Sequence, residues 1–365
     1  MTLLARGDGP PEPPGVGVWF DLRNPPGWRQ DPARLYGFTL ELCEEAERLG
    51  ADSLWFSEHH GFEDGYLPQP LTFAAAAAAR TTRVRLGTGI LVAPLRKTAQ
   101  LAEEAAVVDL ISGGRLDLGL GAGYRVPEFE LFGTDVTARY RILDQQVGEL
   151  RRLWGDGGLT PAPVQDRLPI WLGYRGPKGA RRAGRMGEGL LTLAASSWPH
   201  YRDGLAEGGH DPALARMGGG VQAYVTDDPE RDWPRVAPHI AYAQDSYRRY
   251  MTEGTGQPVP RPVDPERLRT RGPDAGPLSY FLFGTPEQVA ASIRDHAGEG
   301  PVRTVWLGAS VAGLPEDLAA RHVQTICTRL RPLLGSPLRP TPGPRPAATQ
   351  PAAAVPVPAG QRAEG

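Results

Sequence analysis

The sequence predicts an α/β fold in which eight strand–helix units close into a (β/α)8 TIM barrel. Short apolar runs of strand length alternate with amphipathic segments of helix length along one continuous body. No change of composition divides that body into two halves, which counts against the structural alternative, a doubly wound open sheet. Chemically capable residues repeatedly follow the predicted strands, where such a barrel places its active face.

The predicted strands are short and apolar, and each is followed by a segment with helical character. The strands cover residues 16–22, 53–57, 83–94, 115–121, 169–174, 189–195, 220–226 and 304–310. The helices cover residues 32–49, 70–80, 98–112, 139–154, a segment that begins at Pro177, 199–208, 229–253 and 315–334.

Several of these helices carry start or stop signals. Asp31 can cap a helix whose first position is Pro32, and apolar residues then recur with helical spacing until Gly50. The alanine run within 70–80 favours a helix and permits close packing. Pro177 fits the first position of another helix.

Three segments rich in proline, alanine or glycine lack apolar periodicity. Residues 1–15 and 335–365 are predicted to be disordered tails on either side of a barrel domain at 16–334, because they cannot bury enough surface to offset the entropy of ordering. The third segment, 254–277, is predicted to be an insertion loop between the seventh and eighth strands. This loop is either a lid over the active face or a surface loop that takes no part in the site.

The overall charge and the cysteine content restrict the classes of function. The formal net charge of −2 and a pI near 6.4 give no reason to expect nucleic acid or an anionic membrane as a partner. No apolar run approaches the ~20 residues of a membrane span, and the first residues lack the pattern of a signal peptide. The two cysteines, Cys43 and Cys327, argue against a disulfide framework and fit a reducing compartment, so a cytoplasmic location is expected.

A carboxylate and two imidazoles, Glu58, His59 and His60, stand together where the second strand ends. Neighbouring strand residues point to opposite faces, and the other histidines do not lie at obvious strand ends, so no metal site is predicted. Imidazole exchanges protons near neutral pH and Glu58 can orient it, which favours an acid–base or hydrogen-bonding role. The alternative is a polar rim of satisfied side chains.

Glycine-rich strings follow the fourth and fifth strands. In GLGAGYR (119–125) the glycines either let the backbone approach a ligand or belong to a tight turn, and their spacing is not the dinucleotide fingerprint. GYRGPKG (173–179) opens a helix whose free N–H groups, together with Arg175 and Lys178, favour an anion such as the phosphate of a cofactor. A solvated surface loop is the alternative for that second string.

Together these motifs resemble those of the bacterial luciferase-like flavin-dependent monooxygenases, over about residues 16–334. The resemblance is carried by residues 51–60, 80–125, 128–133, 169–173 and 284–290. It implies a luciferase-like barrel that receives reduced FMN from a separate flavin reductase and uses dioxygen to oxygenate a small organic substrate. It also implies a homodimer.

The resemblance further implies roles for individual residues. His59 matches the catalytic histidine of the luciferases, and we expect Glu58 to tune it and His60 to support the pocket. A non-prolyl cis peptide is expected at Gly89–Ile90. The implied cofactor-binding residues are Thr88, Gly89, Ile90, Gly121, Ala122, Gly123, Tyr124, Gly173, Tyr174, Arg175 and Gly176. The expected walls of the substrate pocket are Trp19, Phe20, Tyr124 and Trp198.

The chain departs from the family pattern at one phosphate contact. Ala122 stands where many members carry an arginine, and Arg125 or Arg175 is expected to compensate. The GLGAG string also resembles members that use a deazaflavin coenzyme, so a deazaflavin-dependent hydride transferase is one alternative. A non-catalytic flavin-binding protein on the same scaffold is another.

Overall fold

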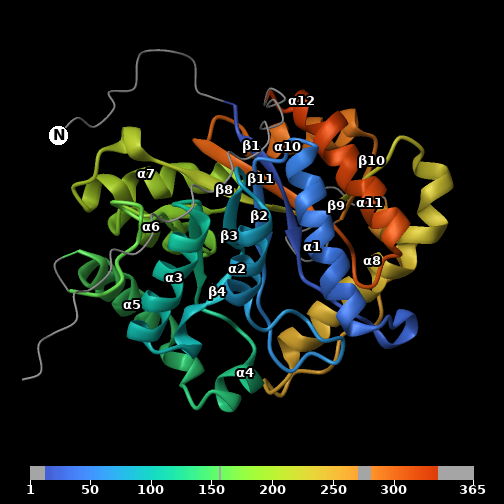
Figure 1. Ribbon diagram of the computed structural model, residues 1–365. Coiled ribbons are helices and arrows are strands. Elements are labelled where there is room, and N and C mark those ends of the chain that lie inside the picture. Colours follow the sequence, from blue (N-terminus) through green and yellow to red (C-terminus); the bar gives the residue numbers. More distant parts are fainter. Residues whose placement is uncertain (1–12, 156–157, 270–280, 336–365) are drawn as a thin grey trace, which may run out of the picture.

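The computed structural model describes residues 13–155, 158–269 and 281–335 (Figure 1). The two predicted tails lie almost wholly outside the described residues, and so does the part of the predicted insertion loop beyond residue 269. Within the described residues the main sheet is a closed parallel barrel with helices packed around it. The predicted fold class is thereby confirmed.

Eight strand positions close the barrel, because β3 and β4 are two pieces of one interrupted strand and both pair with β5. The barrel strands are β1 (Gly15–Phe20), β2 (Ser53–Phe56), β3 (Arg85–Thr88), β4 (Leu91–Val92), β5 (Leu116–Gly121), β6 (Ile170–Leu172), β7 (Gly189–Leu191), β8 (Met217–Val221) and β11 (Val302–Gly308). Their order is β3-β2-β1-β11-β8-β7-β6-β5-β4, and the β3–β5 pairing completes the ring.

The helices follow the strands much as their sequence signals predict. They are α1 (Pro32–Arg48), α2 (Pro70–Arg80), α3 (Thr98–Ser112), α4 (Val126–Leu131), α5 (Arg139–Trp154), α6 (Gly176–Arg185), α7 (Trp198–Glu207), α8 (Pro229–Thr252), α9 (Pro265–Arg269), α10 (Pro286–Ala297), α11 (Glu316–Thr325), a π turn (Ile326–Leu330) and α12 (Arg331–Leu333). Asp31 caps α1 as predicted, since its carboxylate accepts a hydrogen bond from the Arg34 N–H at 2.8 Å.

The seventh predicted strand differs most from the structure. Its first part belongs to β8, whereas Ala223–Val225 (β9) leaves the barrel and pairs in parallel with β10 (Leu282–Gly284). The buried ring of Tyr224 holds β9 in place, because it stacks on Phe283 and on His322 with centroids 5.8 and 4.3 Å away. Within the predicted insertion loop, the described part includes the short helix α9.

Tryptophans and glycines share the inside of the barrel. The tryptophans come from β1, β2, β6 and β11: Trp19, Trp55, Trp171 and Trp306. Trp55 and Trp306 stack with their centroids 3.9 Å apart. A Cβ on Gly87 would lie 2.3 Å from the Trp55 ring, and one on Gly220 would lie 2.7 Å from Trp306, so glycine on the adjacent strand makes room for each indole. The filled interior leaves the strand ends as the place for a site.

Two further expectations concern the chain as a whole. Cys43 and Cys327 are free and buried, so the prediction that they form no disulfide is confirmed. Burial raises the pKa of Cys327 to about 12, which makes this thiol a poor nucleophile. In the described part of the chain, no helix combines the length and the apolar character that crossing a bilayer requires.

Candidate active site

His59 follows β2 directly and is held between a carboxylate and a phenol. Its Nδ1–H donates to Glu128 Oε1 at 2.8 Å, and the Tyr124 hydroxyl donates to its Nε2 at 3.3 Å. An ionised carboxylate only accepts hydrogen bonds, so this arrangement places the ring proton on Nδ1 and leaves Nε2 as the acceptor. The His59 side chain keeps 10% exposure.

Glu128 is the carboxylate that fixes His59, and the sequence reasoning did not single it out. It lies in the first turn of α4, is 1% exposed, and also accepts the backbone N–H of His60 at 3.0 Å. Oε2 of Glu128 has no hydrogen-bond partner among the described residues. A buried carboxylate on Nδ1 orients the imidazole and fixes its tautomer, as in other histidine–carboxylate pairs.

Glu58 serves a different partner from the one expected. It accepts hydrogen bonds from Arg96 Nη1 at 2.6 Å, from His60 Nε2–H at 2.6 Å and from the Val92 N–H at 2.8 Å. The expectation that Glu58 orients His59 is therefore corrected. Glu58 is turned toward β4, where it ties the end of β2 to the next strand, while His60 packs beside Phe132 with centroids 4.6 Å apart.

Aromatic rings enclose the imidazole of His59. Phe62 stacks on it with centroids 4.4 Å apart, and Tyr66 meets it edge-on at 4.8 Å. Tyr247, on α8, approaches the same ring to 6.1 Å and shares a hydroxyl–hydroxyl hydrogen bond of 2.8 Å with Tyr66. These rings exclude water from most of the imidazole, which strengthens its remaining electrostatic contacts.

A buried charge cluster lies next to this cage. Arg23 Nε donates to Asp64 Oδ2 at 2.7 Å, and both side chains are fully buried. The Arg23 guanidinium also lies over the rings of Tyr242 and Tyr247, at 5.5 and 5.1 Å from their centroids. Burial raises the pKa of the nearby Asp21 carboxyl to about 6, and the Arg23 charge opposes that rise.

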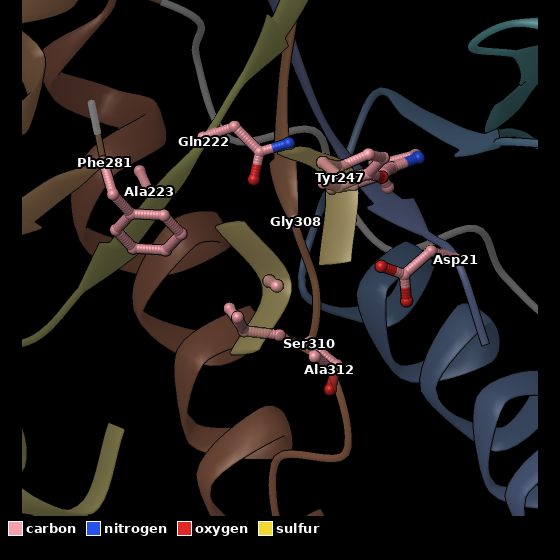
Figure 2. Close-up of a pocket in the computed structure, with 11 residues that line it drawn as sticks. Asp21, Gln222, Ala223, Tyr247, Phe281, Gly308, Ser310 and Ala312 are labelled. Atoms are coloured by element: carbon pink, nitrogen blue, oxygen red, sulfur yellow. The ribbon is translucent and has the colours of Figure 1, made fainter. Parts of the chain in front are cut away.

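Among the predicted pocket walls, Trp19 is well placed and Phe20 is not. Trp19 lines a recess at the end of β1 (Figure 2). Phe20 points outward into the layer between strands and helices, where it stacks on Phe56 at 5.9 Å, because successive strand residues face opposite sides. Trp198 packs on Tyr201 at the start of α7 and is not among the described residues that line the recess.

Several predicted cofactor residues keep partial exposure at the strand ends. They are Gly89, Ile90, Gly123, Tyr124 and Gly173. The Gly89–Ile90 peptide is cis, as expected, and the Ser57 hydroxyl donates to the Gly89 carbonyl at 2.8 Å. Burial raises the pKa of Tyr124, and Arg175 lies near enough to oppose that rise.

Two predicted cofactor residues turn their side chains away from the face. The Thr88 hydroxyl is buried in the seam between β3 and β5, where it donates to the Gly119 carbonyl at 2.7 Å. The Tyr174 hydroxyl donates to Asp144 on α5. For these two residues the structure supports a packing role for the side chain, and their assignment to cofactor binding stays a prediction.

The glycines at the ends of β5 and β6 are explained by packing against Ile90 and its neighbours. A Cβ on Gly121 would lie 2.5 Å from Ile90, and one on Gly173 would lie 3.0 Å from it. Gly123 has a φ of +72°, and a Cβ there would lie 2.6 Å from Val92. At these three positions the absence of a Cβ lets the backbone lie against side chains of the protein itself.

The start of α6 fits the phosphate of a cofactor. No side chain caps this helix, Pro177 occupies its first turn, and nothing lies within 4 Å of a Cβ built on Gly176. Arg175 and Lys178 are both exposed there. Arg125 does not compensate for Ala122, because its guanidinium donates to Glu253 at 2.8 Å and to the His60 carbonyl at 2.6 Å. Free N–H groups, a helix N-terminus and basic side chains suit an anion.

The structure combines an eight-stranded parallel barrel with a buried histidine–carboxylate pair after β2 and with a helix start after β6 that suits an anion. Residues 17–303 match the family model described as luciferase-like monooxygenase. The chain therefore belongs to the luciferase-like monooxygenase family, an oxidoreductase family.

Individual relatives include proteins that use different cofactors. The chain is 35% identical over 165 residues to the oxygenase component of a flavin-dependent trigonelline monooxygenase from Acinetobacter baylyi, covering 41% of this chain and 46% of that protein. It is 31% identical over 186 residues to an F420-dependent glucose-6-phosphate dehydrogenase from Amycolatopsis mediterranei, covering 46% and 56%. These matches span about half the length of each relative.

A solved structure supports the fold across the whole body. The crystal structure of the monooxygenase RslO1 from Streptomyces bottropensis superposes with a TM-score of 0.73 at 25% identity, over 87% of this chain and 99% of that one. The sequence resemblance to the luciferase-like family is thereby confirmed.

Proposed function

We propose that the protein is the oxygenase of a two-component flavin monooxygenase, which uses reduced FMN and dioxygen to oxygenate a small organic substrate. The observation that carries the proposal is the position of His59. Its Nδ1 is fixed by Glu128 and its Nε2 is hydrogen-bonded to Tyr124. Tyr124 is partly exposed at the strand ends, as are Gly89 and Ile90. The similarity to an oxygenase component in Acinetobacter baylyi supports the same assignment.

The described residues fit FMN at two places. Exposed backbone at the start of α6, with Arg175 and Lys178, would hold the phosphate. Ile90 and Tyr124, which are partly exposed at the strand ends, would lie against the ring system. When bound, the reduced flavin supplies the electrons that activate dioxygen.

His59 would move the proton of the reaction. Glu128 keeps the proton on Nδ1, so Nε2 is free to take a proton from a reacting group and return it. The Tyr124 hydroxyl, hydrogen-bonded to Nε2, can pass that proton toward the open face. The rings of Phe62 and Tyr66 keep bulk water from the imidazole.

A second candidate function is deazaflavin-dependent hydride transfer, which is favoured by the similarity to an F420-dependent dehydrogenase. The same pair of His59 and Glu128 would then protonate or deprotonate the substrate while the coenzyme carries hydride. The expected partners differ between the two. The monooxygenase requires a separate flavin reductase, and the hydride transferase does not. A homodimer is expected in both cases.

Anaerobic titration separates these candidates. Purified protein is titrated with reduced FMN and, separately, with reduced F420, and binding is followed by absorbance and calorimetry. The proposal predicts at least tenfold tighter binding of reduced FMN. Tighter binding of reduced F420 would contradict the monooxygenase and support deazaflavin-dependent hydride transfer. Turnover of either coenzyme over many cycles excludes a purely flavin-storing protein, and failure of both to bind would overturn the proposal.

A further inference from the structure

A small recess opens beside the candidate active site, between the ends of β1, β8 and β11 and the helix α8 (Figure 2). Its walls include Trp19, Tyr247 and Phe281, and the Asp21 carboxylate points into it. The interior accommodates a group of about the size of one water molecule. Tyr247 also contacts the His59 ring, with centroids 6.1 Å apart, so the recess and the imidazole share a wall.

Among the described residues, the Asp21 carboxylate forms no ion pair, although the charge of Arg23 acts on it. The only hydrogen bond that it accepts within the described residues comes from the Arg23 N–H, at the long distance of 3.3 Å. The nearest cation, the Arg23 side chain, is already paired through Nε with Asp64 at 2.7 Å. The three side chains together therefore carry one net negative charge when Asp21 is ionised. A buried carboxylate in this state is costly unless a cation joins it.

The recess suits one kind of cationic group better than its alternatives. Its aromatic walls attract positive charge, since the faces of Trp19 and Tyr247 carry a negative potential. A hydroxyl group has the right size but leaves the carboxylate uncompensated. A quaternary ammonium supplies the charge but exceeds the available space. A primary ammonium group has both the charge and a size close to that of water.

We propose that this recess binds the protonated primary amine of the substrate, with Asp21 as its counter-ion. The assignment deepens the proposed function and rests on it, because the bound molecule is a substrate only if the chemistry takes place at His59. Tyr247 lines the recess and also contacts the imidazole, so an ammonium group at Asp21 would lie one aromatic ring away from His59. The structure thus points to primary amines as the substrate class.

Three matched probes test the proposal by calorimetry at pH 8, on the full chain with and without reduced FMN. They are butylammonium, butan-1-ol and butyltrimethylammonium. Butylammonium is expected to bind at least tenfold more tightly than the other two. Asp21→Asn is expected to abolish that preference. Glu63→Gln, which removes an exposed carboxylate paired with Arg249, is the matched control and is expected to keep it.

The wild-type protein supplies a second measurement that needs no variant. Lowering the pH from 8 to 5 is expected to weaken butylammonium binding about tenfold, because the pKa of Asp21 is about 6 and the amine stays charged. In the described part of the chain, the ionisable groups near Asp21 and the recess include Arg23, Asp64, Tyr66, Tyr247 and His239. They are retained in Asp21→Asn, so the pH dependence of that variant is the baseline.

The outcomes separate the amine proposal from the proposed function. Equal binding of the three probes, absence of butylammonium binding, or a preference that survives in Asp21→Asn would overturn the amine proposal and leave the recess as a water site. Selective butylammonium binding without binding of reduced FMN would keep the cation site and remove the oxygenase. Binding of reduced FMN without a preference for the amine would keep the oxygenase and remove the cation site.

Discussion

Replacing Asp21 with asparagine tests whether the buried carboxylate at the end of β1 costs the protein stability. Burial raises the pKa of this group from 3.8 to about 6, with the Arg23 charge opposing the rise. The folded state therefore binds the proton more tightly than the unfolded chain does. The stability that protonated Asp21 contributes is complete below pH 3.8 and is lost as the pH rises through 6. The difference in pKa corresponds to about 3 kcal/mol of unfolding free energy at neutral pH.

The asparagine variant carries no charge at this position, so its free energy of unfolding does not fall as Asp21 would ionise. About 2 kcal/mol of the cost arises between roughly pH 4.5 and pH 8, so we expect Asp21→Asn to gain about that much over wild type across this interval. Urea denaturation followed by tryptophan fluorescence measures the gain. Glu63→Gln serves as control and is expected to behave as wild type. A difference between Asp21→Asn and wild type that is the same at both pH values would refute the reasoning.

Three further substitutions test other parts of the account. Glu128→Gln is expected to slow the reaction of bound reduced FMN with dioxygen by ~10–100-fold, measured by stopped-flow absorbance. The reason is that His59 Nδ1 is held by a charged hydrogen bond, which contributes about 1.5–3 kcal/mol. Gly87→Ala is expected to lower the free energy of unfolding by about 1–3 kcal/mol in urea denaturation, because its Cβ would lie 2.3 Å from Trp55. Arg175→Gln is expected to weaken reduced FMN binding about tenfold in an anaerobic titration and to leave riboflavin, which has no phosphate, unaffected.

Each substitution has its own control. Glu130→Gln, an exposed carboxylate on the same helix as Glu128, is expected to react at the wild-type rate, and an equal rate in both variants would contradict the role of Glu128. Gly148→Ala, where nothing lies within 4 Å of the new Cβ, is expected to keep or gain stability, so equal stability of Gly87→Ala would contradict the packing argument. A parallel loss of FMN and riboflavin binding in Arg175→Gln would contradict the phosphate contact.

The barrel could be predicted from sequence because its signals are local. Asp31 with Pro32 marks the start of α1, and apolar runs of strand length mark β1, β2 and β5. The apolar runs also predicted the three-residue strands β6 and β7, and the strand predicted at 220–226 contains β9. They did not show that β9 pairs with β10 outside the barrel, because this pairing is a contact between segments more than fifty residues apart.

The site was predictable only where its residues are neighbours in sequence. Glu58, His59 and His60 stand out at the end of a strand, but Glu128 is 69 positions from His59, lies on the short helix α4 and meets the imidazole only in the folded chain. The packing role of the glycines was hidden for the same reason: Ile90, which fills the space beside Gly121 and Gly173, lies in the break between β3 and β4. Tyr247 is 181 positions from Tyr66, and their shared wall around His59 exists only in the folded chain.

The reaction of bound reduced FMN with dioxygen, compared between wild type and His59→Gln, tests the central claim most directly. We expect both proteins to bind reduced FMN with similar affinity. We expect the substitution to change the rate of flavin oxidation at least tenfold, because His59 Nε2 exchanges the proton of that reaction. Binding in both proteins with the same oxidation rate as free reduced FMN would contradict it, since neither the site nor the imidazole would then take part in the chemistry.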